Sequence, residues 1–309
     1  MAGNVPYGTP TGTSAISNLV QTAYDQYVRM ALRSIPVMRA LADVKPVQQA
    51  MPGSSVVFSI YSDLAQATST LTETSDVSSI ALGNPNQITV TLQEYGSAVT
   101  TTKKLNLTSF NDVDAALADN IAYNAADSID AVVAGVLTSG TNIIYGGTAT
   151  NTAGITAGST ISVSDIRAAV TNLRSNKALP RIGELYAAYL HPKQTAGLRA
   201  ETGTGGFQDL SKYVDRTPFV AGAVGVLEGA FIVETPRVPF TSNGTTNVYS
   251  AIIAGREALA EAQGQDISTV IGPQIDALRR FHTIGWYYFG GWNLLRTAAL
   301  YNIQTATAY

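Results

Sequence analysis

An apolar residue recurs at every fourth position between residues 109 and 137. The positions are Val113, Leu117, Ile121, Ala125, Ile129, Val133 and Leu137. This spacing predicts one long α-helix, and because the helical repeat is 3.6 residues, the apolar stripe moves around the helix by about 40° at each step. Such a stripe cannot be buried in one flat contact, so we expect the two ends of the helix to pack against different partners. Thr108 or Ser109 is the expected N-cap, and Gly140 the expected stop.

Two β-strands are predicted before this helix, on either side of a long polar stretch. Residues 55–61 are rich in β-branched and aromatic side chains, and residues 87–101 begin with alternating apolar and polar positions. The stretch between them contains no Lys or Arg and is rich in Ser and Thr. So long a connection is unusual unless it is functional, and a two-stranded arm without its own core needs another surface. We expect a protruding β-hairpin that lies on a neighbouring molecule; the alternative is a disordered surface loop.

The segment from residue 150 to residue 265 mixes short helical and strand patterns, which is typical of a compact α/β lobe. The predicted helices are 165–176, with Ser164 as N-cap, 192–200 and 256–262. The predicted strands are 183–190, 224–227, 230–234 and 249–254. Loops or turns are expected at 142–160, 202–207 and 241–246.

The first 50 residues predict an N-terminal arm. Residues 1–16 have no periodicity and are expected to be extended, whereas residues 17–32 have apolar positions at helical spacing. Pro36 interrupts this helix, and a short turn is expected at residues 37–41.

Charge is scarce and unevenly distributed along the chain. Charged residues make up 13% and apolar residues 45%; the charged share is about half the usual one, which favours surface that is buried by assembly. Residues 1–45 carry four bases and two acids, residues 46–166 two bases and ten acids, and residues 167–309 thirteen bases and ten acids. Net charges of +2, −8 and +3 predict that parts of one chain lie on complementary parts of another. The alternative is a solvated acidic face.

Acidic residues of the long helix and of the hairpin are the candidate contact residues. No Lys or Arg occurs between Lys104 and Arg167, so the helix acids have no base close in sequence, and the basic N-terminal arm is their obvious partner. The predicted contacts between copies are Asp63, Glu73, Asp76, Arg29, Arg33, Arg39, Asp119, Asp127 and Asp130. As an alternative, the bases of the arm would face nucleic acid, although so few bases give only a weak, salt-sensitive attraction.

Patterns for catalysis or metal binding are nearly absent. The chain has no Cys, which excludes disulfides, Cys-ligated zinc and thiol catalysis. Its two histidines, His191 and His282, are far apart in sequence and are expected to be structural. The Gly-rich stretch 202–207 has no preceding strand and no following Gly-Lys-Ser/Thr, so it is no phosphate loop. Asp127 and Asp130 could ligate a metal or transfer protons, but a solvated or docked face is favoured. We predict no enzyme activity, no cofactor, no metal and no membrane span.

The C-terminal tail carries the most specific pattern. Its aromatic part predicts a strand, Gly290 and Gly291 a bend, and residues 294–303 a last strand. The positions that form the motif are Asp276, Leu278, Arg280, Gly285, Trp286, Gly290, Leu294 and Leu295.

This tail resembles the ends of the major coat proteins of N-four-like tailed phages. Those end in Asp-Pro-Leu, an Arg-Gly turn, Gly-Trp-Lys, a small residue and a leucine pair. The present chain departs from that pattern with Ala277 for the proline, Phe281 for the glycine after arginine, one additional residue before Gly285, and Tyr287 for the lysine. The motif covers only the tail.

The order of the predicted elements is similar to the Hong Kong 97-type phage capsid fold over nearly the whole chain, which implies an α+β protein. The resemblance implies an N-terminal arm at 1–50, an extended hairpin loop at 51–101, a peripheral domain with the long helix at 102–149, an axial domain at 150–265, and a return to the peripheral domain at 266–309.

The resemblance also implies a function and partners. It implies a major capsid protein that assembles as hexamers and pentamers into an icosahedral shell in the host bacterial cytoplasm. The implied partners are packaged double-stranded DNA, bound weakly and without sequence preference, a separate scaffolding protein and a portal. The resemblance also allows a decoration protein as a further partner. Some members crosslink subunits through a lysine of the hairpin; residues 46–102 hold none, so no crosslink is expected. No N-terminal processing is expected either.

Two other classes of protein stay open from the sequence. An encapsulin-type bacterial nanocompartment shell protein has the same fold and encloses cargo enzymes instead of DNA. A soluble α/β hydrolase or a lectin would need a convergent polar site, and we find no residues that build one.

Overall fold

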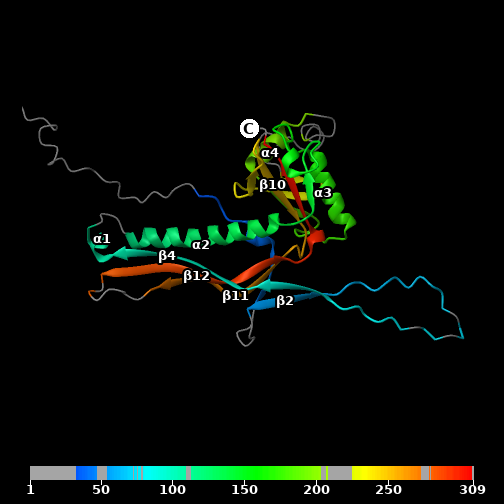
Figure 1. The fold of residues 1–309 in the computed structure, drawn as a ribbon, viewed down its shortest axis with the longest axis horizontal. Helices are drawn as coiled ribbons and strands as arrows, with labels where there is room; N and C mark the ends of the chain where they lie inside the picture. Colours follow the sequence, from blue (N-terminus) through cyan, green and yellow to red (C-terminus); the bar gives the residue numbers. More distant parts are fainter. Residues whose placement is uncertain are drawn as a thin grey trace, which may run out of the picture.

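The computed structural model of the chain describes residues 33–46, 54–71, 73–74, 76–77, 79–108, 113–202, 207, 225–272, 278 and 280–307. The predicted helix at 17–32, Arg29 and most of the loop at 202–207 lie outside these residues. Figure 1 shows a long sheet with a helix along it, a second lobe above one end, and a hairpin that projects beyond that end.

The first sheet has four strands in the order β1 (Ala42–Pro46), β11 (Leu259–Ile271), β12 (Phe281–Leu294) and β4 (Gln93–Thr102). β1 is parallel to β11, and the other pairs are antiparallel. Alternate residues of β12, among them Ile284, Trp286 and Tyr288, are buried in the core that includes the long helix. The aromatic strand predicted in the tail is therefore confirmed.

The long helix is confirmed as α2 (Val113–Thr138), here called the spine helix. Its buried positions Ile121, Ala125, Ile129, Val133 and Leu137 follow the predicted spacing. Trp286 of the first sheet donates from Nε1 to Asn124 Oδ1 at 2.9 Å, whereas Asn302 of the second sheet donates to the carbonyl of Leu137 at 3.1 Å. The spine helix thus contacts the first sheet at Asn124, near its middle, and the second sheet at Leu137, near its C-terminal end. A short helix before it, α1 (Lys103–Thr108), was not predicted, and the predicted cap at Ser109 lies outside the described residues.

The second sheet forms the core of the upper lobe. Its strands run in the order β5 (Ile143–Tyr145), β13 (Leu300–Thr305), β10 (Asn247–Ala254), β6 (Tyr186–Leu190), β8 (Ala230–Glu234) and β7 (Val226–Leu227), with β9 (Phe240–Ser242) beside β10. The helices of this lobe are α3 (Val163–Ser175) and α4 (Pro192–Ala200). The N-cap of α3 is Ser162 and not Ser164, because the Ser162 hydroxyl accepts from the amide of Asp165 while Asp165 accepts from the amide of Ser162.

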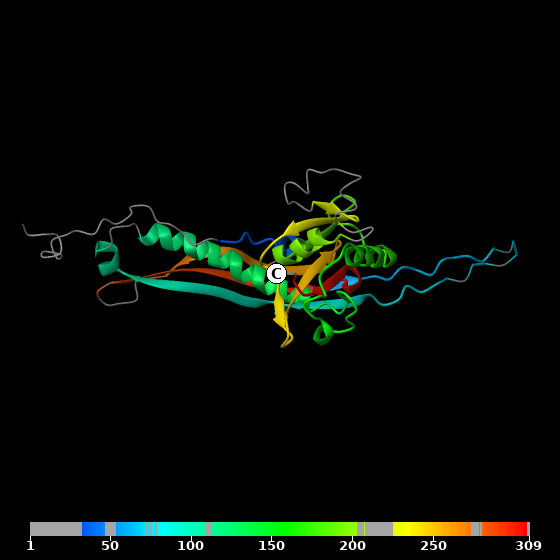
Figure 2. The ribbon, with the colours of Figure 1, turned by 90° about the horizontal axis from the view of Figure 1, so that it is seen from above.

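The predicted hairpin is confirmed as β2 (Ser55–Ile60) paired with β3 (Asn86–Thr91), and the loop between them extends away from both lobes (Figures 1 and 2). The second predicted strand, 87–101, is instead two strands, β3 and β4, which meet at Leu92. Leu92 is buried with Val90, Ala260 and Ala262, so the chain changes sheets at a residue that anchors the hairpin base.

Three expectations about local structure are wrong. The predicted helix at 256–262 is instead a turn at 256–258 followed by the start of strand β11, because pairing with β1 and β12 on both sides overrides the helix propensity of its Ala and Glu residues. Strand β12 continues through Gly290 and Gly291 without a bend; a Cβ at Gly291 would lie 2.0 Å from the carbonyl oxygen of Thr91, so glycine is there for close approach. The last strand begins at Leu300, after a short 3-10 turn.

The chain passes from the second lobe to the first sheet earlier than the expected boundary at residue 265. Strands β11 and β12 belong to the first sheet, so the chain leaves the second sheet at residues 255–258 and not at 265. After β12 the chain returns to the second sheet as β13.

Candidate functional site at the junction of strap and spine helix

The described part of the chain offers no cluster of metal ligands. No group of three or more His, Asp or Glu residues in the described ranges could hold a metal ion. His191 caps α4, because its Nδ1 accepts from the amide of Lys193 at 3.1 Å, and burial lowers the pKa of its imidazole. Among the helices of the same residues, none has the length and apolar content needed to cross a membrane. Five of the nine predicted contact residues gather elsewhere, around residues 33–46, here called the strap.

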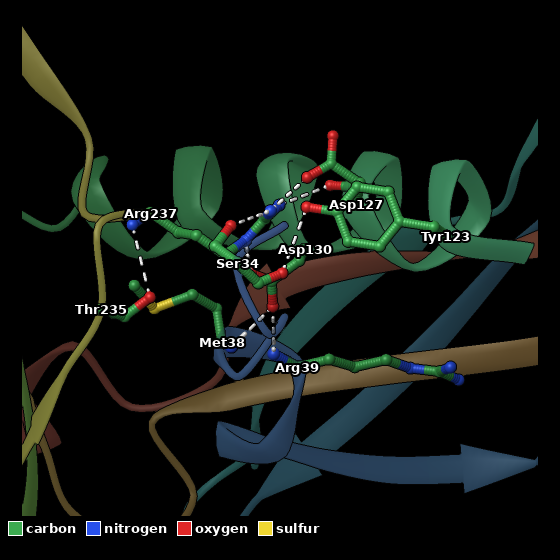
Figure 3. Close-up of polar contacts among 8 residues, drawn as sticks. All are labelled: Ser34, Met38, Arg39, Tyr123, Asp127, Asp130, Thr235 and Arg237. Carbon is green, nitrogen blue, oxygen red and sulfur yellow. Dashed lines mark hydrogen bonds and ion pairs between the residues drawn. The ribbon is translucent and has the colours of Figure 1, made fainter. Parts of the chain in front are cut away.

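Asp130 is the centre of this junction (Figure 3). Its carboxylate is 1% exposed and lies on the spine helix. Oδ1 accepts from the backbone amides of Met38 at 2.6 Å and Arg39 at 3.2 Å, which are at the start of the short 3-10 helix η2 (Met38–Leu41). Amides in the first turn of a helix have no partner within the helix, so the carboxylate both fixes the strap and satisfies its orphan donors.

Arg237 brings the second lobe to the same point (Figure 3). Its Nε donates to Asp130 Oδ2 at 2.5 Å, and its other nitrogens contact the Asp127 carboxylate, the Asp127 carbonyl at 2.8 Å and the Ser34 hydroxyl at 3.2 Å. Burial alone would lower the pKa of this guanidinium, but the hydrogen bonds and charges of Asp127 and Asp130 outweigh it and raise the pKa. One arginine therefore ties the upper lobe to the spine helix and to the strap.

A second buried carboxylate ties the strap to the first sheet. Glu261 of β11 is fully buried and accepts from Arg39 at 2.6 Å and from the Tyr288 hydroxyl at 2.9 Å. The Arg39 guanidinium also lies 5.4 Å from the centre of the Tyr288 ring, within cation–π range. Burial, followed by the negative charge of Glu261, raises the pKa of Tyr288 far above its usual value.

The two ends of the strap carry further ion pairs. At its start, Arg33 pairs with Asp119 at 2.7 Å and lies 4.8 Å from the centre of the Tyr123 ring. At its other end, Asp43 pairs with Arg181 of the second lobe at 3.1 Å and accepts from the amide of Glu257 at 2.8 Å. The strap thus contacts the spine helix, the first sheet and the second lobe.

The structure brings five of the predicted contact residues together at this junction: Arg33, Arg39, Asp119, Asp127 and Asp130. Within one chain, the arm base Arg33 pairs with the helix acid Asp119. The contacts between copies that were expected at Arg33, Arg39, Asp119 and Asp127 stay predictions. The expectation that Asp130 meets another copy is wrong, because its carboxylate is buried and fully engaged inside its own chain.

The remaining predicted residues lie apart from the junction. Asp63, Glu73 and Asp76 are exposed on the hairpin loop, and Arg29 lies outside the described residues. Sequence reasoning missed Arg237, Glu261, Arg181 and Asp43. The only signal was the excess of bases after residue 166, which does not say which base meets which acid.

Comparisons with known proteins agree with this architecture. The sequence model of a family described as "Phage capsid protein" matches residues 13–298. Similar solved structures include the capsid of cyanophage P-SCSP1u (TM-score 0.74, 17% identity, covering 98% of this chain and 97% of that one). The capsid of a native GTA particle is also similar, with a TM-score of 0.71 and 17% identity, over 97% of this chain and 100% of that one. The head of Helicobacter pylori bacteriophage KHP40 has a TM-score of 0.71 and 14% identity, over 98% of this chain and 99% of that one. A search of curated protein sequences gave no significant match.

Proposed function

Because this chain belongs to the phage capsid protein family and is a structural major capsid protein of a tailed phage with the Hong Kong 97-type fold, we propose that it assembles as hexamers and pentamers into an icosahedral shell. In this proposal the shell encloses double-stranded DNA. The subunit has no catalytic role, and the encapsulin alternative is not favoured.

The observation that carries the proposal is the uncovered hairpin loop. Residues 61–85 connect Ile60 to Asn86, which form the last pair of the hairpin, and the described residues of this loop form no strand pairing. Leu71, Ile80 and Leu82 in this loop are 58–75% exposed. A loop with exposed apolar side chains and no core is stable only when another surface covers it, and other copies of the chain would supply that surface.

The junction would serve assembly by holding the subunit in one shape. A closed symmetric shell repeats the same contacts between copies, so the two lobes of each copy must keep a defined angle. The strap fixes that angle, because Asp130, Arg237 and Glu261 join both lobes and the spine helix through buried polar contacts. We retain Asp63, Glu73, Asp76, Arg29 and the exposed part of Asp127 as proposed contacts between copies.

The further partners follow from the same proposal. The particle would form in the cytoplasm of the host bacterium with a separate scaffolding protein and a portal. Weak contacts with DNA would come from scattered bases, because the net charge of −3 gives no strong general attraction for nucleic acid. The subunit surface would leave room for a decoration protein.

The test is to purify the chain, expressed alone and together with the scaffolding protein of its phage, and to examine it by sedimentation and electron microscopy. We expect closed shells, and DNA in particles recovered from phage-producing cells. A chain that stays monomeric under both conditions would contradict the proposal, and particles filled with cargo enzyme would favour an encapsulin.

A further inference from the structure

A cavity of about 490 Å³ lies where the hairpin base meets the two lobes. It is lined by Ile60, Asn86 and Ile88 of the hairpin base, by residues 176–179 of the second lobe, and by residues 256–257 and 295–299. In the last two segments the chain crosses between the sheets, from β10 to β11 and from β12 to β13. Figure 1 shows the hairpin base at the end of the first sheet that carries the second lobe. A ligand in this cavity would therefore contact both lobes and the hairpin.

Positive charge dominates the lining of this cavity. Its charged residues are three bases, Lys177, Arg256 and Arg296, and one acid, Glu257, which gives a net charge of +2. Glu257 pairs with Arg296 at 2.7 Å. Lys177 and Arg256 are exposed and form no ion pair with any residue that the structure describes. Bases that line one cleft repel one another and raise the local concentration of anions, so the cavity favours an anionic ligand.

Lys177 occupies a position at which glycine is the ordinary residue. Helix α3 ends in a Schellman motif. The amide of Lys177 donates to the carbonyl of Arg174 at 3.0 Å, and the next amide, of Ala178, donates to the carbonyl of Leu173 at 3.0 Å. The backbone of Lys177 is left-handed, with a φ of 57°, which glycine adopts freely and other residues only with strain. A charged side chain that lines a cavity from a strained position is typical of a functional site.

A second lining residue, Glu257, has the same feature. Its φ is 57°, and its amide donates to Asp43 Oδ2 of the strap at 2.8 Å. Only three non-glycine residues in the described ranges have a positive φ, and two of them, Lys177 and Glu257, line this cavity. Because Glu257 also pairs with Arg296, the two strained turns hold a large part of the cavity's charge in place.

The chemistry of the lining fits an organic phosphate. A phosphate monoester carries a charge of about −1.5 to −2 at pH 7, which balances the net charge of the lining. Arginine binds phosphate oxygens through paired donors and lysine binds them as a point charge, and Asn86 and Thr297 can add neutral donors. The apolar lining residues Ile88, Leu179 and Leu295 offer surface for the remainder of the ligand. The volume is within the usual range of small-molecule sites.

We propose that this cavity binds an organic phosphate of the size of a mononucleotide, with the phosphate held by Lys177, Arg256 and Arg296. The bound ligand bridges the hairpin base and both crossings between the lobes, and so restrains their relative motion. Inorganic phosphate offers the same charge, but it leaves the apolar lining without a partner. Any effect on assembly rests on the proposed shell function, whereas the binding itself is a property of the single subunit.

An acidic protein segment is the competing occupant and is disfavoured. A carboxylate carries one negative charge, so two acidic side chains of a peptide would have to enter the cavity together to balance its net charge of +2. Ordering a flexible peptide also costs conformational entropy that a small ligand does not lose. Tetra-aspartate is a suitable probe of this alternative.

The test is isothermal titration calorimetry of unassembled subunits at constant ionic strength, with adenosine monophosphate, inorganic phosphate, adenosine and tetra-aspartate as separate probes. We expect adenosine monophosphate to bind at least about tenfold more tightly than each of the other three. Arg256→Gln should weaken its binding at least about tenfold, because a charge-assisted hydrogen bond is lost. Lys193→Gln, an exposed change in α4 outside the cavity, is the matched control and should leave the binding unchanged.

The variant Lys177→Gly separates binding from folding. Glycine keeps the left-handed turn without strain, so this variant should unfold at a temperature no lower than that of wild type. It should nevertheless bind adenosine monophosphate at least about tenfold more weakly. A purely structural role of Lys177 predicts the opposite, a lower unfolding temperature with unchanged binding. Hydrogen exchange should show protection by the nucleotide at residues 295–299 and in the hairpin base.

The outcomes of the titrations separate the alternatives. Equal affinity for inorganic phosphate and for the nucleotide would overturn the assignment of an organic ligand. Absence of binding, or binding that neither Arg256→Gln nor Lys177→Gly weakens, would overturn the site itself. Tighter binding of tetra-aspartate than of the nucleotide would overturn it in favour of a protein partner. Whether the wild-type chain forms shells is measured separately, so failure of this site and failure of the proposed function are distinguishable.

Discussion

Asp130 and Arg237 are 107 residues apart in the chain, yet Nε of the arginine lies 2.5 Å from Oδ2 of the aspartate. The side chains are 1% and 10% exposed. This pair joins the spine helix to the upper lobe, and the second carboxylate oxygen of Asp130 holds the strap. Asp130 thus joins the spine helix, the strap and the upper lobe through one buried carboxylate.

Asp130→Asn should destabilise the subunit by about 3 kcal/mol, because Arg237 would lose a buried ionic partner that the uncharged amide cannot replace. The measurement is the free energy of unfolding of unassembled subunits in urea. Asp119→Asn is the matched control, because the Asp119 side chain, which pairs with Arg33, is 57% exposed. Loss of this ion pair should cost no more than about 1 kcal/mol. Equal costs for the two changes would contradict the central role of Asp130.

Tyr288 should make the protein sensitive to alkaline pH. Burial and the neighbouring Glu261 raise the pKa of Tyr288 above its ordinary value of about 10. The unfolded chain therefore releases this proton near pH 10 while the folded chain keeps it, so the free energy of unfolding falls as the pH rises above about 10. Tyr288→Phe should be less stable at pH 8 but should show a shallower decline above pH 10.

The matched control for this pH prediction is Tyr61→Phe, because Tyr61 is 61% exposed at the start of the hairpin loop. It should leave both the stability at pH 8 and the alkaline slope unchanged. If the free energy of unfolding falls with pH equally in wild type and Tyr288→Phe, Tyr288 is not the cause of the alkaline sensitivity.

Gly291→Ala should loosen the base of the hairpin. The added Cβ would lie 2.0 Å from the carbonyl oxygen of Thr91, which is backbone and cannot move without shifting strand β3. We expect a loss of about 1–3 kcal/mol, as for other overpacked sites, and faster hydrogen exchange in β2 and β3. Gly135→Ala on the exposed face of the spine helix has no atom within 4 Å of its new Cβ and should stabilise by about 0.5–1 kcal/mol. A Gly291 variant as stable as wild type would contradict the close approach.

Ser162→Ala should destabilise helix α3 by about 1 kcal/mol, because it removes the hydroxyl that accepts from the amide of Asp165. Ser164→Ala, two residues later, leaves that cap in place and should cost no more than a few tenths of a kcal/mol. Thermal unfolding of both variants compares them directly. A larger loss for Ser164→Ala would show that the helix begins later.

The sequence predicted the elements whose signal lies within one continuous segment of the chain. The apolar residues at every fourth position predicted the spine helix, and the composition of residues 55–101 predicted the hairpin. Each of these signals lies within one segment. Segment 256–262 was predicted as a helix because nothing within it reveals that β1 and β12 flank it. The same limit hid Arg237 and Glu261, whose partners come from distant parts of the chain. The predicted contact residues include Arg33, Arg39 and the helix acids of the junction, but not Arg237 or Glu261, which bind to them.

The most direct test of the account is a cryo-electron microscopy reconstruction of the assembled particle at a resolution that traces side chains. We predict an icosahedral shell in which residues 61–85 of every copy are ordered against another copy. A particle whose hairpin loops project into solvent without touching another copy would contradict it.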